Sequence, residues 1–189
     1  MTGELFFTLF ETAVGCCGLA WGERGLVAVQ LPEGSEEATR GRLERRFPRA
    51  RELAPQEAPS GIASARRRIV ALLDGGSDDL ADLRLDLGRV EAFNREVYAV
   101  ARTIRPGETL TYGEVAARIG QPEAAQAVGR ALGRNLWPIV VPCHRVLAAG
   151  GRIGGFSATS GIALKRRLLA IESVHAGGPP TLFDWQRAG

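Results

Sequence analysis

Short apolar runs alternate with turn signals in the first third of the chain. The runs lie at residues 5–10, 16–21 and 26–31 and are rich in β-branched, aromatic and aliphatic side chains. Glycine-containing turns separate them, so the pattern predicts a small antiparallel meander of three strands. Cys16 and Cys17 are neighbours in the second run, and successive side chains of a strand point to opposite faces. We therefore expect these two thiols on different faces of the sheet.

Helical patterns follow this meander. Ser35 opens a segment that reaches Pro48, and this arrangement predicts an N-capped helix. Residues 62–73 predict a second helix, which two glycines close. Residues 83–87 alternate leucine with charged side chains and predict an edge strand or the start of a linker. Together these elements predict an α/β N-terminal domain over residues 1–88.

Beyond this boundary the pattern is mainly helical. Residues 93–104 carry apolar side chains at helical spacing. Thr111 and Glu114 have the spacing of a capping box and predict the start of another helix. A short turn then leads to a helix over residues 123–134, so the two helices form a helix-turn-helix candidate. A last helix is expected over residues 161–171, and the C-terminal domain is expected to cover 89–173.

The second helix of this pair has an unusual surface. Its small residues are Ala124, Ala125, Ala127, Gly129, Ala131 and Gly133, while Gln126, Arg130 and Arg134 project on another side. Each glycine costs a helix about 1 kcal/mol relative to alanine. Such a helix suits close approach of something else, either another helix of the same protein or a DNA groove.

Charge is unevenly distributed. The net charge is +3, but residues 1–90 hold 12 arginines and 14 acidic residues, whereas residues 91–189 hold 12 basic and 7 acidic residues. No acid occurs between Glu123 and Glu172. Seven basic residues lie in that interval, and a stretch of one sign favours a polyanionic partner such as nucleic acid.

The acid-free interval contains Pro142-Cys143-His144-Arg145-Val146. A free thiol is only a few per cent thiolate at neutral pH, and a neighbouring base or positive charge raises that fraction. Because His144 and Arg145 can supply both, Cys143 is a candidate nucleophile. A buried, inert cysteine is the simpler interpretation of such a thiol taken alone.

The sequence gives little support to a disulfide-rich, zinc-binding, membrane or secreted protein. Three cysteines make no disulfide framework, and two histidines do not complete a tetrahedral zinc set. We therefore expect no metal and no cofactor. The apolar stretches are too short to span a bilayer, and residues 1–10 do not have the pattern of a signal peptide. A cytoplasmic protein is the default expectation.

Taken together, these motifs resemble the O6-alkylguanine-DNA alkyltransferases, or methylated-DNA–protein-cysteine methyltransferases. The resemblance rests on residues 109–116, Ala127-Val128-Gly129, Arg134-Asn135, the Pro-Cys-His-Arg-Val block, Gly154-Gly155-Phe156-Ser157 and residues 168–172. It is strong over residues 93–172. Over residues 4–90 it is weaker and implies the family's small ribonuclease-H-like α/β domain.

The resemblance implies a suicidal DNA repair reaction. An alkylated guanine is flipped out of the duplex, and its O6-alkyl group passes to Cys143 in a single turnover; O4-alkylthymine is a further possible substrate. A base atom inside the stack is reached only by extrusion. The implied partner is double-stranded DNA with alkylated guanine. The protein is expected to bind it as a monomer and to associate with the nucleoid when bound.

The resemblance also implies roles for individual residues. Cys143 is the acceptor, His144 its base through a water, and Glu172 the carboxylate that polarises this histidine. Asn135 holds the active-site turn, Tyr112 donates to guanine N3, and Arg145 buttresses the site. The base pocket is implied at Cys143, Val146, Gly155, Phe156 and Ser157. Minor-groove contacts are implied at Ala124, Ala125, Gln126, Ala127, Gly129, Arg130 and Arg134.

The sequence departs from the family pattern in three places. Gln126 stands where the family has an intercalating arginine, Phe156 stands where many members have tyrosine, and residues 157–161 form a longer turn. Glutamine can hydrogen-bond the orphan cytosine but brings no charge.

Three alternatives remain at this level. A non-catalytic alkyltransferase-like protein would bind alkylated guanine and signal to another repair pathway, although such proteins typically carry tryptophan at the acceptor position. A transcriptional regulator would present polar base-reading side chains, and a cysteine hydrolase would need a deacylating water. Residues 174–189 read as a tail, in which 181–183 weakly resemble a sliding-clamp-binding peptide.

Overall fold

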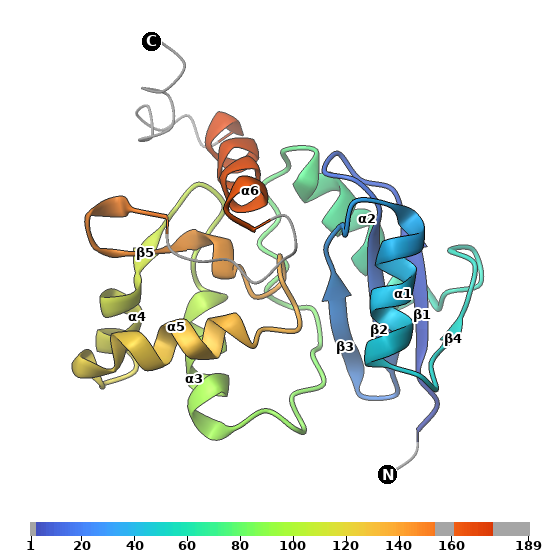
Figure 1. Ribbon diagram of the computed structural model, residues 1–189, viewed down its shortest axis with the longest axis horizontal. Helices are drawn as coiled ribbons and strands as arrows, with labels where there is room; N and C mark the ends of the chain where they lie inside the picture. Colours follow the sequence, from blue (N-terminus) through green and yellow to red (C-terminus); the bar gives the residue numbers. More distant parts are fainter. Residues whose placement is uncertain (1–2, 154–160, 176–189) are drawn as a thin grey trace.

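The computed structural model describes residues 3–153 and 161–175. Its N-terminal part is built on a four-stranded sheet in the order β3-β2-β1-β4 (Figure 1). The strands are β1 (Phe6–Phe10), β2 (Cys17–Gly22), β3 (Gly25–Gln30) and β4 (Arg51–Glu52). The first three form the predicted antiparallel meander, with Phe6 opposite Trp21 and Phe10 opposite Cys17.

One detail of the predicted sheet is wrong. The sheet is mixed, because the short strand β4 pairs with β1 in parallel. Of the two interpretations of residues 83–87, an edge strand or the start of a linker, the structure favours the linker, since the pairing is limited to one bridge between Leu26 and Leu85. The backbone of this segment makes two hydrogen bonds with Leu26, from the Leu26 amide to Arg84 and from the Asp86 amide to Leu26. This segment therefore touches the sheet at one point and continues as a linker.

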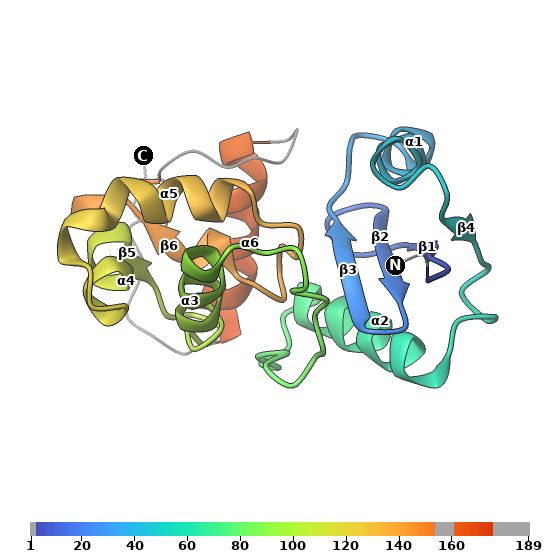
Figure 2. The ribbon, with the colours of Figure 1, turned by 90° about the horizontal axis from the view of Figure 1, so that it is seen from below.

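Helices cover both faces of this sheet. Helix α1 (Glu36–Arg46) and helix α2 (Ser60–Leu73) lie on opposite sides of the strands (Figure 2). Ser35 caps α1 as predicted, since its Oγ accepts a hydrogen bond from the Ala38 amide at 3.1 Å. The two faces bury separate clusters, and Cys16 belongs to one while Cys17 belongs to the other. The predicted alternation of the two thiols is confirmed.

The C-terminal part is mainly helical. It contains α3 (Ala92–Ala101), β5 (Leu110–Thr111), α4 (Tyr112–Arg118), α5 (Ala125–Gly133), β6 (Val146–Leu147) and α6 (Gly161–His175). Single 3-10 turns occur at η1 (Pro122–Ala124), η2 (Cys143–Arg145) and η3 (Ala149–Gly151). Strands β5 and β6 pair in parallel.

Three helix boundaries differ from the prediction. Helix α3 ends at Ala101 instead of Ile104, because residues 103 and 104 make shorter i→i−3 turns before Pro106. The helix expected from residue 123 opens with the 3-10 turn η1 and becomes α-helical at Ala125. Helix α6 extends four residues beyond Ile171, to His175.

The helix-turn-helix has well-formed ends. Thr111 and Glu114 make both hydrogen bonds of the predicted capping box at the start of α4. At the other end Gly120 adopts a φ of 74°, and the Gly120 and Gln121 amides bond to the carbonyls of Ala117 and Ala116. This Schellman arrangement turns the chain directly into η1 and α5. The relative placement of α4 and α5 is therefore specified by local sequence.

The two parts share buried contacts. The Trp137 indole Nε1 donates to the Leu26 carbonyl at 2.8 Å, and the Val29 amide donates to the Leu136 carbonyl at 2.8 Å. Both bonds join strand β3 to the segment that follows α5. In the described ranges, 3–153 and 161–175, none of the helices has both the length and the apolar character needed to cross a membrane.

Candidate active site around Cys143

Cys143 lies at the start of the 3-10 turn η2, in the segment that joins α5 to β6. Asn135 holds this segment in place. Its Nδ2 donates to the Val141 carbonyl at 2.8 Å and to the Cys143 sulfur at 3.4 Å, while its Oδ1 accepts from the Trp137 amide at 2.8 Å. One side chain thus ties both ends of the segment to each other and to the thiol.

The same segment contains a strained residue. Ile139 has a φ of 76° and is buried. A β-branched residue in the left-handed region is an outlier that costs of order 1–3 kcal/mol and persists only where surrounding contacts impose it. The apolar run 139–141 is therefore a tightly held loop and not a strand, and it presents Cys143 at a set position.

The Cys143 thiol is only 7% exposed. Burial raises its pKa, whereas the Asn135 hydrogen bond and the positive charge of Lys165 act to lower it. Cys16 and Cys17 are also buried, mainly by apolar neighbours, and burial raises their pKa values to about 11 and about 12. Of the three thiols, Cys143 is the one that faces a nearby cation and an amide donor.

His144, Arg145 and Glu172 form a buried polar cluster behind the thiol. His144 Nε2 lies 2.9 Å from Glu172 Oε1, and Arg145 donates to both Glu172 oxygens at 2.7 to 3.2 Å. Arg145 also donates to the Ile104 carbonyl at 2.5 Å. Arg145 therefore ties α6 to the turn that follows α3.

The charges of this cluster determine the state of the imidazole. Burial disfavours the Glu172 carboxylate, yet His144 and Arg145 outweigh burial and bring its pKa to about 2. Burial lowers the pKa of His144 and outweighs the opposing effect of Glu172, while the charges of Arg145 and Lys165 lower it further. A carboxylate only accepts hydrogen bonds, so the proton of a neutral imidazole sits on Nε2. Nδ1 is buried and has no hydrogen-bond partner among the described residues, so it offers a free lone pair.

Tyr112 is the first residue of α4 and lies within electrostatic range of the thiol. Burial raises its pKa, and a charge on Cys143 raises it further. The Cβ position of Gly129 in α5 lies 3.8 Å from the Tyr112 ring. The helix-turn-helix and the active-site turn therefore meet at this tyrosine.

Helix α5 presents the predicted small and polar residues to solvent. Gln126, Arg130 and Arg134 are exposed, whereas Val128, Ala131 and Leu132 are buried. An added Cβ at Gly133 would meet nothing within 4 Å, and at Gly129 only the ordinary contact with Tyr112. Packing inside the described protein therefore does not require these glycines.

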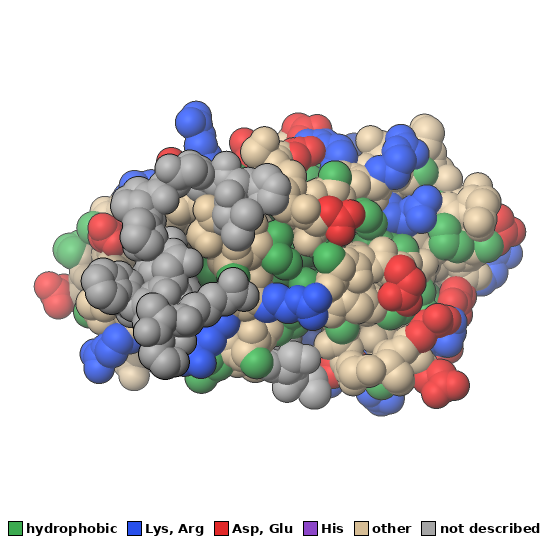
Figure 3. Space-filling view, turned by 90° about the horizontal axis from the view of Figure 1, so that it is seen from above, with side chains coloured by type: hydrophobic (Ala, Val, Ile, Leu, Met, Phe, Trp, Pro, Cys, Tyr) green, Lys and Arg blue, Asp and Glu red, His purple; other side chains and the backbone are tan. Residues whose placement is uncertain are grey.

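Acidic side chains are unevenly distributed between the N-terminal and C-terminal parts. In the view of Figure 3, acidic side chains lie mostly over the N-terminal part. Ala124, Ala125 and Ala127 are partly exposed, and the α4–α5 region carries several arginines with Glu114 and Glu123 as its acids. A surface with exposed arginines and small side chains is compatible with a phosphate backbone.

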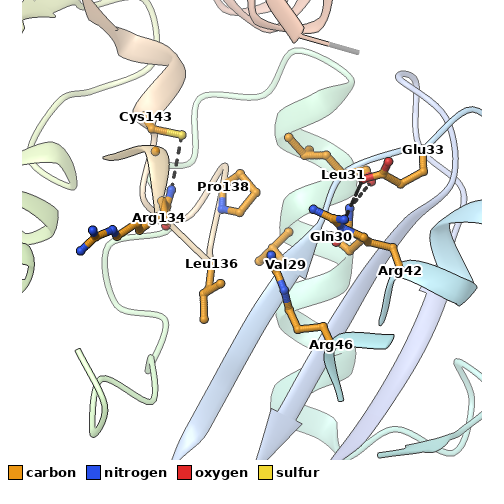
Figure 4. Close-up of a pocket in the computed structure, with 12 residues that line it drawn as sticks. Val29, Gln30, Leu31, Glu33, Arg42, Arg46, Arg134, Leu136, Pro138 and Cys143 are labelled. Carbon is orange, nitrogen blue, oxygen red and sulfur yellow. Dashed lines mark hydrogen bonds and ion pairs between the residues drawn. The ribbon is translucent and has the colours of Figure 1, made fainter. Parts of the chain in front are cut away.

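A cavity of about 150 Å³ lies between the two parts and reaches Cys143 (Figure 4). Strand β3, helix α1 and the segment after α5 line it, including Val29, Arg42, Arg46, Asn135 and Pro138. Sequence reasoning missed the contribution of Arg42 and Arg46, because nothing in the sequence places α1 opposite Cys143. It also missed Lys165, which is fully buried beside the site; as the chain's single lysine, it offered a signal.

The predicted base-pocket residues Gly155, Phe156 and Ser157 lie outside the described residues, as does the tail segment 181–183. Val146 is described and is fully buried directly after η2. Glu11, Cys16 and Glu36 bring three possible metal-ligand atoms within 4.8 Å of one another. Glu11 and Glu36 are exposed, and exposed acidic groups commonly lie together without an ion.

Comparison with known proteins gives one consistent result. Residues 92–174 match the DNA-binding domain of 6-O-methylguanine DNA methyltransferase. The methylated-DNA–protein-cysteine methyltransferase of Mycolicibacterium paratuberculosis is 44% identical over 128 residues, covering 68% of this chain and 75% of that protein. The protein of the same name from Methanothermobacter thermautotrophicus is 36% identical over 162 residues, covering 85% and 81%.

Solved structures agree with this result over almost the whole chain. Mycobacterium tuberculosis O6-methylguanine methyltransferase superimposes with a TM-score of 0.70 at 31% identity, covering 96% of this chain and 99% of that one. The complex of Mycobacterium tuberculosis OGT with DNA gives a TM-score of 0.71 at 31% identity, covering 90% and 94%.

Proposed function

Because the chain belongs to the methylated-DNA–protein-cysteine methyltransferases and has their enzyme activity in DNA repair, we propose that Cys143 is the residue that accepts the alkyl group. The observation that carries this proposal is the surroundings of the thiol. The Asn135 amide contacts its sulfur, and the neighbouring His144 has a buried, unpaired Nδ1. Cys16 lies beside the carboxylates of Glu11 and Glu36, which disfavour a thiolate, and Cys17 contacts the Thr12 hydroxyl within an apolar cluster.

The first step is removal of the thiol proton. His144 accepts it at Nδ1 through a water, while the Nε2–H bond to Glu172 keeps the imidazole in the required tautomer. Glu172 is held in turn by Arg145, so this acid orients the base and remains ionised. The roles proposed for His144 and Glu172 follow from this geometry.

The second step is transfer. The Cys143 sulfur attacks the alkyl carbon, the bond between that carbon and guanine O6 breaks, and the electron pair stays on the purine. Tyr112 donates its proton to guanine N3, and the raised pKa of this phenol means that the proton is present at neutral pH. The product is a thioether, which water does not cleave, so each molecule acts once.

Reaching the base requires DNA bound close to α5. The small residues Ala127 and Gly129 leave room for the minor groove, and the exposed Arg130 and Arg134 meet phosphates. The alkylated guanine then rotates out of the stack into the pocket beside Cys143. Gln126 occupies the gap and bonds the orphan cytosine. The same chemistry extends to O4-alkylthymine, and the protein acts as a monomer on the nucleoid.

Intact mass spectrometry tests the proposal. After incubation with a duplex that contains O6-methylguanine, the protein should gain the mass of one methylene unit, because a methyl group replaces the hydrogen of the Cys143 thiol. Cys143→Ala should bind the duplex and gain nothing, while Cys16→Ala should react like the wild type. Tight binding with unchanged wild-type mass would favour a non-catalytic alkyltransferase-like protein. A methyl group on Cys16 or Cys17 would show that one of these residues, and not Cys143, is the acceptor.

A further inference from the structure

Lys165 is an exceptional residue in this chain. The sequence holds 24 lysines and arginines together, and Lys165 is the single lysine among them. It lies on α6 with an exposed fraction of 0%. Removing a charged ammonium from water costs several kcal/mol unless an opposite charge or good hydrogen bonds compensate it. A buried lysine therefore needs a partner.

The geometry attaches Lys165 to the active-site turn. Its Nζ donates to the Val146 carbonyl at 2.7 Å. The Val146 amide donates to the Cys143 carbonyl and thereby closes the 3-10 turn η2. The ammonium is thus held at the end of the turn that begins with the nucleophile.

The nearby carboxylate is already engaged. Within residues 3–153 and 161–175, Glu172 is the one acidic side chain that is buried. It receives three hydrogen bonds from Arg145 and lies against His144, and no ion pair of Lys165 with an acid occurs in this part of the chain. Glu172 therefore does not balance Lys165, and a negative charge on another nearby group would stabilise the ammonium against the cost of its burial.

We propose that Lys165 is a positioning residue that supplies the counter-charge of the Cys143 thiolate. The proposal deepens the function proposed above and rests on Cys143 being the nucleophile. It assigns His144 to moving the proton and Lys165 to holding the charge that the proton leaves behind. A lysine suits this role because its ammonium is a compact point charge, whereas an arginine fork needs several acceptors.

The groups around the thiol support this division. They are Tyr98 of α3, Tyr112 of α4, His144 and Arg145 of η2, and Lys165 and Glu172 of α6. Both tyrosines are neutral at pH 7, since burial raises their pKa values, that of Tyr98 to about 12. His144 is neutral because burial lowers its pKa, and Arg145 cancels Glu172. A thiolate with a charged Lys165 makes this buried set electrically neutral. Arg42, Arg46 and Arg134, which line the cavity that reaches Cys143, are exposed to solvent.

The charges of Lys165 and Cys143 each favour the charged form of the other group. Burial lowers the pKa of Lys165, and the charge of Cys143 raises it. Burial raises the pKa of Cys143, and the charge of Lys165 is among the causes that lower it. An opposite charge within about 4–6 Å shifts a pKa by roughly 1–3 units.

Titration of the thiolate tests the proposal without DNA. Ultraviolet absorbance of the thiolate is followed against pH in the wild type, in Lys165→Met and in Arg166→Met, each corrected by the same protein with Cys143→Ser. We expect Lys165→Met to raise the apparent pKa of Cys143 by one unit or more, because the counter-charge is lost. Arg166→Met removes an exposed cation one residue away and should leave the titration unchanged.

His144→Gln provides the second measurement. It should shift the apparent pKa of Cys143 by less than Lys165→Met, because the imidazole is neutral. The proposal is overturned if folded Lys165→Met titrates like the wild type, or if His144→Gln raises the apparent pKa of Cys143 by one unit or more. The second criterion decides alone if circular dichroism shows that Lys165→Met is unfolded. Methyl transfer by the wild type, weighed separately, reports on the proposed function itself.

Discussion

At the scale of single residues, the site depends on a few side chains that each hold several groups. Asn135 connects the thiol, the Val141 carbonyl and the Trp137 amide. Glu172 connects His144 with Arg145. Because such buried networks are costly when one member is missing, we expect both residues to matter for stability as well as for chemistry.

The Glu172 cluster predicts a particular dependence of stability on pH. The pKa of Glu172 is lowered from 4.5 to about 2, so its stabilising contribution is complete above about pH 4.5 and is lost as pH falls from there to 2. The full effect is about 3 kcal/mol. Urea unfolding of the wild type and of Glu172→Gln should give free energies that differ most above pH 4.5 and converge toward pH 2.

Glu44→Gln is the matched control for this prediction, since Glu44 is exposed on α1. Its difference from the wild type should be small at every pH. A constant difference between the wild type and Glu172→Gln from pH 2 to 7 would show that the ionised carboxylate does not stabilise the fold.

At the scale of elements, helix α5 is less stable than its length permits. Gly129 and Gly133 lie within it, although the space around both positions admits a Cβ. Glycine in a helix interior is unfavourable. The capping box fixes the start of α4, and the hydrogen bonds of the Gly120 and Gln121 amides fix its end. These contacts determine where α5 begins and so partly offset the cost of its glycines. We infer that α5 retains its glycines for a partner outside the chain.

Gly129→Ala should therefore have effects of opposite sign. The variant should gain about 0.5–1 kcal/mol in free energy of unfolding through helix propensity. It should also bind duplex DNA more weakly, because the added methyl group stands on the face proposed to meet the groove. Thermal unfolding and a fluorescence-anisotropy titration with duplex measure the two quantities.

Gly41→Ala is the control on helix α1, where an added Cβ meets only the flexible end of Arg45. It should give a similar gain in stability and unchanged DNA affinity. Unchanged affinity in Gly129→Ala as well would remove this face of α5 from the proposed DNA interface.

At the scale of the whole molecule, the N-terminal part supports the active-site segment. One buried apolar cluster extends across both parts and includes Leu26, Ile69, Val97, Trp137 and Leu168. The Trp137–Leu26 and Val29–Leu136 hydrogen bonds anchor the loop that carries the strained Ile139. The sheet thus serves the chemistry by holding the segment that presents Cys143.

Trp137→Phe tests this support. It removes the indole donor and part of a buried ring, so we expect a loss of about 1–3 kcal/mol in free energy of unfolding. The loss of the hydrogen bond itself should be small, since the Leu26 carbonyl keeps its bond from the Asp86 amide. The rate of methyl transfer, measured in single-turnover experiments, should fall because the loop loses its anchor.

Trp21→Phe is a suitable comparison, because Trp21 is buried in β2 and stacks on Phe6, within the sheet of the N-terminal part. It should destabilise the protein and leave the transfer rate of the folded fraction unchanged. Equal rates for Trp137→Phe and the wild type would mean that the anchor is dispensable for chemistry.

Local sequence determined much of this protein. The meander, the caps at Ser35 and Thr111 and the tight turn at Gly120 depend on neighbouring residues, so short-range patterns predicted them. The block around Cys143 indicated the family in the same way, because the residues that make up this motif are consecutive in the sequence. The division at residue 88 stays a prediction.

Tertiary structure decided what distant segments do to one another. The parallel strand β4 and the single bridge at Leu85 depend on long-range pairing, which has no local signal. The positive φ of Ile139 is imposed by surrounding contacts against the preference of the residue itself. The sharing of Glu172 between His144 and Arg145, and the burial of Lys165 beside Cys143, arise only when α6 folds back on the turn. Sequence supplies the reactive groups, but their charges and proton positions depend on burial and on neighbours that only the fold brings together.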